Sequence, residues 1–359
     1  MSELANLITL GWNDFFAEHF APLAQQGYEV GRVAIQHKGA YTLLTEHGEL
    51  RGEITGKMLY FSDSPLDLPA VGDWVAIRPR VEEGAATIHE LLPRKSKFVR
   101  KAPGEKVEEQ VVATNIDNVF LVTGLDGDYN LKRLERYLVL AWESGAHPIV
   151  VLNKIDLCED RSALLQEVQT VALHVPILMM SALDNEGVEA MRPYLGVGLT
   201  GALLGSSGVG KSTIINQLLG EDRQKIKEVR ATDSRGRHTT THRELIALPF
   251  GGLLMDTPGM RELQLWGSGE GFDDTFEDIL ALAQQCRFRD CQHLAEPGCA
   301  VAAALESGAL HTRRYENYLK LQKEIAYQHR KSDLMAELKE KSKWKKIHAA
   351  HKKQQNKKK

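Results

Sequence analysis

Hydrophobic and polar positions change their period along the chain, and each change predicts a different region. Residues 1–27 predict a short amphipathic helix with apolar side chains at Leu7, Leu10, Phe15, Phe16 and Phe20. Residues 28–97 instead alternate turn signals with short β-rich runs, such as 30–35, 41–44 and 74–77. About five short strands in roughly 70 residues predict a small barrel, for which an OB-like barrel fits best, although an SH3-like barrel would have much the same pattern.

An α/β pattern follows in residues 105–265. Helical stretches, such as 131–143 and 212–219, separate most of the apolar runs that are typical of buried strands. These runs are 118–122, 148–152, 175–180, 201–204 and 253–256. Such alternation predicts a parallel sheet with helices on both faces.

The C-terminal part has a different character. Residues 266–345 combine a cysteine-rich segment with a helical stretch at roughly 310–345, and residues 346–359 form a Lys-rich tail that we expect to be flexible. Residues 331–359 hold 11 lysines and three acidic residues, although the whole chain has a net charge of −3, so the rest is acidic. A basic tail on an acidic body suggests an arm that contacts a polyanion, usually nucleic acid.

Composition excludes several classes of protein. With 359 residues, of which 43% are hydrophobic and 26% are charged, the chain can form two or three globular domains. No apolar run approaches the ~20 residues of a membrane-spanning helix, and the N-terminus lacks the basic start of a signal peptide. Three of the four cysteines lie within 286–299, which argues against a disulfide framework and favours a cytoplasmic location.

Residues 205–212 read Gly-Ser-Ser-Gly-Val-Gly-Lys-Ser and match the phosphate-binding pattern G-x-x-x-x-G-K-[ST] in full. The motif lies between a predicted strand and a predicted helix, so backbone N–H groups and the helix N-terminus can surround phosphates. Lys211 would reach the β- and γ-phosphates, and the Ser212 hydroxyl would bind Mg²⁺. The predicted phosphate-site residues are Gly205, Ser206, Ser207, Gly208, Val209, Gly210, Lys211, Ser212 and Thr213.

A second phosphate motif, Asp-Thr-Pro-Gly, begins at Asp256 where an apolar run ends. The Asp256 carboxylate could hold Mg²⁺ through water, and the Gly259 N–H could approach the γ-phosphate. Alone, Asp256 could equally be an ordinary aspartate between a strand and a turn. Its place after a phosphate-binding loop favours the Mg²⁺ interpretation.

The sequence Asn-Lys-Ile-Asp that starts at Asn153 follows a predicted strand and is typical of a guanine site. Asp156 can accept hydrogen bonds from guanine N1–H and the 2-amino group, and adenine has no donors there. The Lys154 stem can cover the base, Asn153 would tie this loop to the phosphate loop, and the Ser181-Ala182 pair can offer a backbone N–H to guanine O6. The tetrapeptide alone could be a solvated loop, but with the phosphate loop it favours GTP over ATP.

The guanine motif precedes the phosphate loop, with Asn153 lying 52 residues before Gly205. Ras-like GTPases have the opposite order. A parallel sheet tolerates such a permutation if the original ends are joined elsewhere. The cut falls just after Gly259, and the chain then leads into the cysteine-rich segment instead of returning to the sheet.

Four residues in the C-terminal part have the types and the spacing of a metal site, C-x4-C-x-H-x5-C. They are Cys286, Cys291, His293 and Cys299. Three thiolates and one imidazole suit a closed, tetrahedral, structural Zn²⁺ site. The alternative is a set of buried free cysteines with an incidental histidine. Polar residues between the ligands suggest an exposed knuckle that could contact RNA.

Together these features resemble the ribosome small-subunit-dependent GTPase A family, the circularly permuted GTPases of bacterial small-subunit maturation. The resemblance covers residues 28–330 and includes the barrel, the zinc knot and the motifs at 153–156, 205–213, 236–241 and 256–260. It implies a multidomain fold with an N-terminal OB-like β-barrel, a central α/β P-loop GTPase domain of permuted motif order, and a C-terminal zinc-knot plus helical domain. The predicted parts are a helical extension and these three domains followed by the tail: 1–27, 28–97, 105–265, 266–345 and 346–359.

The resemblance also implies how GTP is hydrolysed. Met260 stands where Ras-like enzymes have a water-orienting glutamine, and a methionine cannot orient water, so intrinsic hydrolysis should be slow. The resemblance offers His238 as the catalytic group, with a solvated loop histidine as the equal alternative. It also makes Thr240 the contact to Mg²⁺ and the γ-phosphate, with Thr239 and Thr241 still open.

The implied function is a GTPase that binds the small (30S) ribosomal subunit and its rRNA, assists late maturation and is stimulated by the subunit. Its implied cofactors are GTP or GDP, Mg²⁺ and one structural Zn²⁺. The family suggests ribosome-binding factor A as a further partner, and we expect a cytoplasmic monomer with no membrane contact.

Two other functions stay open. A signalling or membrane-linked GTPase is one, although the barrel, the zinc knot, the basic tail and the absence of a lipidation motif argue against it. The other is a non-hydrolysing RNA-binding assembly module in which GTP is only a structural ligand, which Met260 permits.

Overall fold

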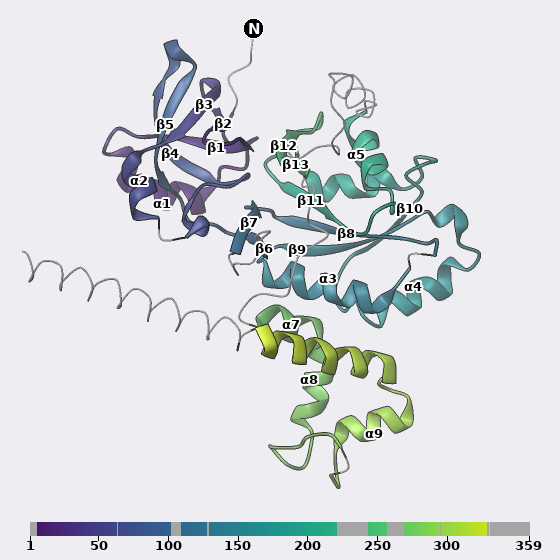
Figure 1. Ribbon diagram of the computed structural model, residues 1–359. Helices are drawn as coiled ribbons and strands as arrows, with labels where there is room; N and C mark the ends of the chain where they lie inside the picture. Colours follow the sequence, from purple (N-terminus) through teal and green to yellow (C-terminus); the bar gives the residue numbers. More distant parts are fainter. Residues whose placement is uncertain are drawn as a thin grey trace, which may run out of the picture. The chain divides into compact units, whose positions relative to one another are not determined.

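The computed structural model describes residues 6–62, 64–101, 109–127, 129–220, 243–256, 269–294, 296–328 and 330 (Figure 1). These residues divide into two units. The first holds the N-terminal segment, the barrel, the GTPase sheet and α7 (Glu270–Thr275), and the second holds Gly269 and the described residues from Phe276 onward.

The predicted barrel is confirmed, and it is closed. Its strands pair in the order β1-β2-β3-β5-β4, and β4 pairs again with β1; all these pairs are antiparallel except β3 with β5. This order, with α2 (Gly56–Phe61) after β3, is that of an OB-fold, and Val33, Leu43 and Ile77 pack in its core. The strands are β1 (Glu29–Gln36), β2 (Tyr41–Thr45), β3 (Gly48–Ile54), β4 (Trp74–Arg80) and β5 (Ala85–Leu91), with short turns η1 (Pro65–Asp67) and η2 (Val81–Glu83).

The N-terminal helix is shorter than the segment 1–27 in which it was predicted. Helix α1 covers Asp14–Ala24, because residues 7–11 form a turn that ends at Gly11 with φ 90°. Trp12 and Phe16 pack against the buried Trp74 of the barrel, with ring centroids 4.9 and 5.9 Å from that of Trp74. The segment therefore extends the hydrophobic core of the barrel.

The GTPase sheet continues from the barrel, because β1 also pairs with β12. Its strands lie in the order β10-β9-β8-β11-β13-β12, and all are parallel except β12. Each predicted apolar run overlaps a strand of this sheet, although the strand in the run 175–180 begins only at Ile177; β12 was not predicted. The strands are β8 (Asn118–Gly124), β9 (His147–Asn153), β10 (Ile177–Met180), β11 (Thr200–Leu204), β12 (Glu244–Ala247) and β13 (Leu253–Asp256).

Helices cover both faces of this sheet (Figure 1). On one face, Phe120 and Val122 of β8 pack in one cluster with Ile214 of α5. Helix α3 contacts β8 and β9, and α7 packs against α3. The bounds are α3 (Leu131–Glu143), α4 (Arg161–Gln169), α5 (Lys211–Leu219), η3 (Ile155–Leu157) and η4 (Val188–Leu195). A separate hairpin of β6 (Lys97–Lys101) and β7 (Glu109–Thr114) precedes the sheet.

A buried guanidinium also joins the barrel to the GTPase sheet. Arg32 of β1 is 1% exposed and donates hydrogen bonds to the carbonyl oxygens of Leu10, Gly72 and Asn115 and, at 2.8 Å, to the Thr200 hydroxyl at the start of β11. Burial lowers the pKa of Arg32 to about 10, against the opposing effect of nearby carboxylates, so the side chain is charged at neutral pH. The barrel, the N-terminal segment and the phosphate-loop strand thus share one donor group.

The second unit packs α8 (Glu277–Gln284), α9 (Ala300–Ser307) and a helix at 312–328. Arg314 donates to both carboxylate oxygens of Asp278, at 2.8 and 2.7 Å, and lies over the ring of Phe276. The predicted helical stretch at 310–345 is present up to residue 328, and residues 331–345 and the tail 346–359 lie outside the described residues. Among the helices that the structure describes, none is long and apolar enough to cross a membrane.

Replacement of Arg32 should destabilise the first unit. We predict that Arg32→Met lowers its free energy of unfolding by ~3 kcal/mol or more, because several buried acceptors lose their donor. Arg51→Met, at a side chain that is 72% exposed on β3, is the matched control. Urea unfolding followed by circular dichroism measures both variants, and equal midpoints would contradict the role of Arg32.

Candidate nucleotide and metal sites

The phosphate-binding motif forms the turn between β11 and α5, in the predicted strand–loop–helix context. Gly210, at φ 98°, directly precedes α5. The Lys211 ammonium donates to the carbonyl oxygens of Gly205 and Ser206, at 2.6 and 2.5 Å. Gly205 lies directly against β8, because a Cβ atom there would be 2.3 Å from the Val122 carbonyl oxygen. The loop is therefore packed at the N-terminus of a helix, where its N–H groups favour an anion.

Asn153 connects the guanine motif to two other loops. Its side chain is buried; Nδ2 donates to the Val209 carbonyl oxygen of the phosphate loop at 2.8 Å, and Oδ1 accepts from the Ala182 N–H at 2.9 Å. A Cβ atom at Gly210 would be 2.2 Å from Asn153 Nδ2, so the glycine is required for this contact. The tie between Asn153 and the phosphate loop that the sequence predicted is present.

The other residues of the guanine motif lie in a tight turn. Lys154 has a left-handed backbone, with φ 68°, and Asp156 is exposed in η3. The Lys154 ammonium forms an ion pair with Asp126, which follows the end of β8. Because the Ala182 N–H already donates to Asn153, guanine O6 would have to share this donor at the predicted contact.

Two side chains that the sequence did not predict, Asp184 and Gln217, hold the Ser181-Ala182 loop. The buried Ser181 hydroxyl donates to Asp184 Oδ2 at 2.7 Å, and Gln217 Nε2 of α5 donates to the Ala182 carbonyl oxygen at 3.2 Å. Asp184 is three residues from Ser181, so a serine turn could have been suspected there. Gln217 belongs to no motif, and its contact depends on how α5 packs on the sheet.

The predicted Mg²⁺ ligands are only partly described. Asp256 ends β13, which is parallel to β11, so it lies at the same edge of the sheet as the phosphate loop. Ser212 is exposed in the first turn of α5. The residues considered above in the motifs at 236–241 and 256–260, other than Asp256, lie outside the described residues: His238, Thr239, Thr240, Thr241, Gly259 and Met260.

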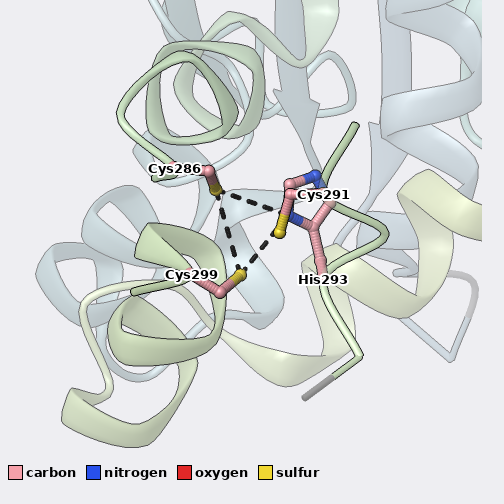
Figure 2. Close-up of side chains that lie close together, drawn as sticks. All are labelled: Cys286, Cys291, His293 and Cys299. Atoms are coloured by element: carbon pink, nitrogen blue, oxygen red, sulfur yellow. Dashed lines mark hydrogen bonds between the residues drawn. The ribbon is translucent and has the colours of Figure 1, made fainter. Parts of the chain in front are cut away.

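The three cysteines and the histidine predicted as zinc ligands converge in the second unit (Figure 2). All four ligand atoms lie within 4.8 Å of one another. Cys286 Sγ is 3.9 Å from Cys299 Sγ and 3.6 Å from His293 Nδ1, and His293 Nδ1 is 3.4 Å from Cys299 Sγ. Zinc–sulfur bonds of about 2.3 Å at tetrahedral angles separate two sulfurs by about 3.8 Å, so the arrangement fits Zn²⁺.

The N-terminus of α9 points its N–H groups at this cluster. The Ala302 N–H donates to Cys299 Sγ at 3.3 Å. Burial acts to raise the pKa of the Cys286 thiol, but hydrogen bonds with the N–H groups of Val301 and Ala300 and with the Cys299 and Cys291 side chains together outweigh it and bring the pKa below its ordinary value. Because the thiolate is the form that binds metal, the helix end favours ligation.

Comparison with known proteins gives matches along nearly the whole chain. A model of the RsgA GTPase family matches residues 91–266. A protein of Opitutus terrae, named small ribosomal subunit biogenesis GTPase RsgA, is 50% identical over 351 residues, which are 95% of this chain and 96% of the relative. A relative with the same name from Streptomyces coelicolor is 44% identical, and the match covers 89% of this chain and 86% of that protein.

Two solved structures are similar to this one. YjeQ from Thermotoga maritima is 28% identical, with a TM-score of 0.62, and the match covers 82% of this chain and 97% of that one. YloQ, described as a circularly permuted GTPase, is 25% identical, with a TM-score of 0.61 and coverage of 84% and 96%.

The identity to the Opitutus terrae protein extends beyond single motifs, because it spans 95% of the chain. The family model covers the guanine motif, the phosphate loop and Asp256 in the permuted order seen in the sheet. This chain therefore belongs to the RsgA GTPase family and is a GTP hydrolase with circularly permuted motifs.

Proposed function

We propose that this GTP hydrolase binds the small ribosomal subunit and assists its late maturation, and that the subunit stimulates slow hydrolysis. The observation that carries the proposal is the match, over 95% of the chain, to a relative named for small ribosomal subunit biogenesis. The match includes both the barrel and the Cys₃His cluster, which a GTPase domain alone does not need. A signalling GTPase with a protein partner would explain neither.

In this proposal the guanine base lies beside Asn153. Asp156 accepts hydrogen bonds from guanine N1–H and the 2-amino group, and its exposure in η3 makes the carboxylate accessible. The Lys154 stem covers the base. The Ala182 N–H, adjacent to the buried Ser181, is shared between Asn153 and guanine O6.

The phosphates and Mg²⁺ bind at the β11–α5 turn. Lys211 exchanges the carbonyl oxygens of its own loop for the β- and γ-phosphates, which carry more negative charge. The Gly259 N–H contacts the γ-phosphate, and His238 supplies the catalytic group that Met260 cannot. The proposed Mg²⁺ ligands are Ser212, Thr240 and Asp256.

The remaining parts bind zinc and RNA. Cys286, Cys291, His293 and Cys299 hold one structural Zn²⁺. The barrel and the second unit contact ribosomal RNA, and the Lys-rich tail 346–359 adds phosphate contacts. We propose that the protein acts as a monomer in the cytoplasm, with ribosome-binding factor A as a further partner on the subunit.

Added small subunits should stimulate GTP hydrolysis by the full chain, on the order of 100-fold, because Met260 leaves intrinsic hydrolysis slow. Lys211→Ala should abolish turnover, and His238→Ala should bind GTP normally but lose the stimulation. Phosphate release under multiple turnover measures the rates, with purified large subunits as the control. Equal rates with and without small subunits would reject the proposed function, and failure to sediment with them would favour another partner.

The guanine assignment predicts a change of base preference. Asp156→Asn should bind GTP more weakly and gain affinity for xanthosine triphosphate, because an amide can donate to the 2-position carbonyl of xanthine. Competition binding with both nucleotides measures this preference. Unchanged GTP affinity and selectivity would remove Asp156 from the site.

The metal assignment predicts about one zinc per purified chain. Cys291→Ser should lower zinc occupancy and loosen the second unit while nucleotide binding is largely retained. Cys158→Ser, outside the cluster, is the control and should keep its zinc. Elemental analysis measures the zinc content of each variant. Full zinc content in Cys291→Ser would exclude Cys291 as a ligand.

A further inference from the structure

An acidic side chain lies beside the guanine motif without being part of it. Gly124, the last residue of β8, is paired with Asn153, the last residue of β9. The next N–H along, that of Leu125, donates to the Asn153 carbonyl oxygen at 2.9 Å. The two loops therefore leave the sheet side by side, and this places Asp126 next to Lys154.

Gly124 leaves the space in which these two side chains meet. The Lys154 ammonium donates to Asp126 Oδ2. A Cβ atom at Gly124 would lie 3.6 Å from Lys154 Cδ and 3.0 Å from Asp126 Oδ1. Because Lys154 has a left-handed backbone, its side chain leaves the turn in a direction that the backbone fixes. The lysine stem thus runs over the glycine to the carboxylate.

The turn that carries Asp126 is itself anchored. The Tyr129 N–H donates to the Asp126 carbonyl oxygen at 3.2 Å, which closes the turn. The Tyr129 hydroxyl donates to Glu167 Oε2 of α4 at 2.8 Å. The carboxylate therefore approaches Lys154 from a segment with its own support.

The solvent exposure of Lys154 and Asp126 limits how much their ion pair can stabilise the fold. The side chains of Lys154 and Asp126 are 28% and 34% exposed, so solvent screens the pair and its contribution to folding stability is small. Its larger effect is on the freedom of the lysine side chain, because ordering a long, flexible side chain on binding reduces affinity.

We propose that Asp126 is a positioning residue for nucleotide binding that acts through Lys154. The carboxylate holds the ammonium, and the lysine stem is ordered before the base arrives. The proposal rests on the proposed guanine site, because it takes the Lys154 stem as the cover of the base. Since GTP and GDP share the base, Asp126 affects both nucleotides alike.

The test is a double-mutant cycle with the full-length protein. Asp126→Asn should weaken binding of GTP and of GDP by the same factor, about two- to tenfold, with little change in the thermal unfolding midpoint. Lys154→Met keeps the apolar stem and removes the ammonium. In that background Asp126→Asn should have no further effect on either dissociation constant, measured by titration calorimetry.

The controls separate this proposal from the one on which it rests. If the parent protein binds no GTP, the proposed function fails before Asp126 is tested. If the parent binds GTP and Asp126→Asn binds it equally or more tightly, the positioning role is overturned. The positioning role is also overturned if Asp126→Asn weakens nucleotide binding in the Lys154→Met background as much as it does in the parent. Glu186→Gln, which breaks the exposed pair with Arg161, should leave affinity unchanged, and equal weakening there would show a nonspecific effect.

Discussion

The side-chain amide of Asn153 uses both its donor and its acceptor inside the protein, and the proposed nucleotide site depends on these two bonds. A planar amide fixes the direction from one bond to the other, so Val209 of the phosphate loop and Ala182 are held in a set relation. Gln217 of α5, a helix that begins at the phosphate loop, donates to the Ala182 carbonyl oxygen. Loss of the Asn153 amide would leave its buried partners without a hydrogen bond. The free-energy cost of such an unpaired buried group exceeds the net stabilisation that one hydrogen bond provides.

These bonds do not depend on the order in which the loops occur along the chain. The strands β8, β9 and β10 precede β11 in sequence, yet β11 lies between β8 and β13 in the sheet. Parallel strands pair by register, and a connection needs only the length to cross one face of the sheet. The carboxyl ends of the strands stay together whichever connection is cut. Permutation therefore preserves the arrangement of these loops, while the chain after β13 leads into the cysteine-rich segment instead of returning to the sheet.

The sequence predicted what is local and missed what depends on packing. The phosphate loop, the guanine motif and the metal cluster each keep their chemistry within a short stretch, and apolar runs locate the strand ends beside them. Arg32 and Thr200 are 168 residues apart and meet only because the barrel joins the sheet. Asp126 is near Lys154 through the register of β8 and β9. Strand number could not separate an OB-like from an SH3-like barrel, but the parallel pairing of β3 with β5 does.

The burial of the cations separates those that hold the fold from those at the proposed nucleotide site. Arg32 is 1% exposed, and its planar guanidinium donates to several acceptors. The Arg314 side chain is 4% exposed and donates to both carboxylate oxygens of Asp278. The Lys154 side chain is 28% exposed, and Lys211 is half-buried and donates to neutral carbonyl oxygens. A partly solvated ammonium can exchange such partners for phosphate oxygens at little cost, whereas a buried guanidinium that left its acceptors would leave them unpaired. The arginines can therefore set the positions of strands and helices, while Lys211 can exchange its carbonyl partners for an anion.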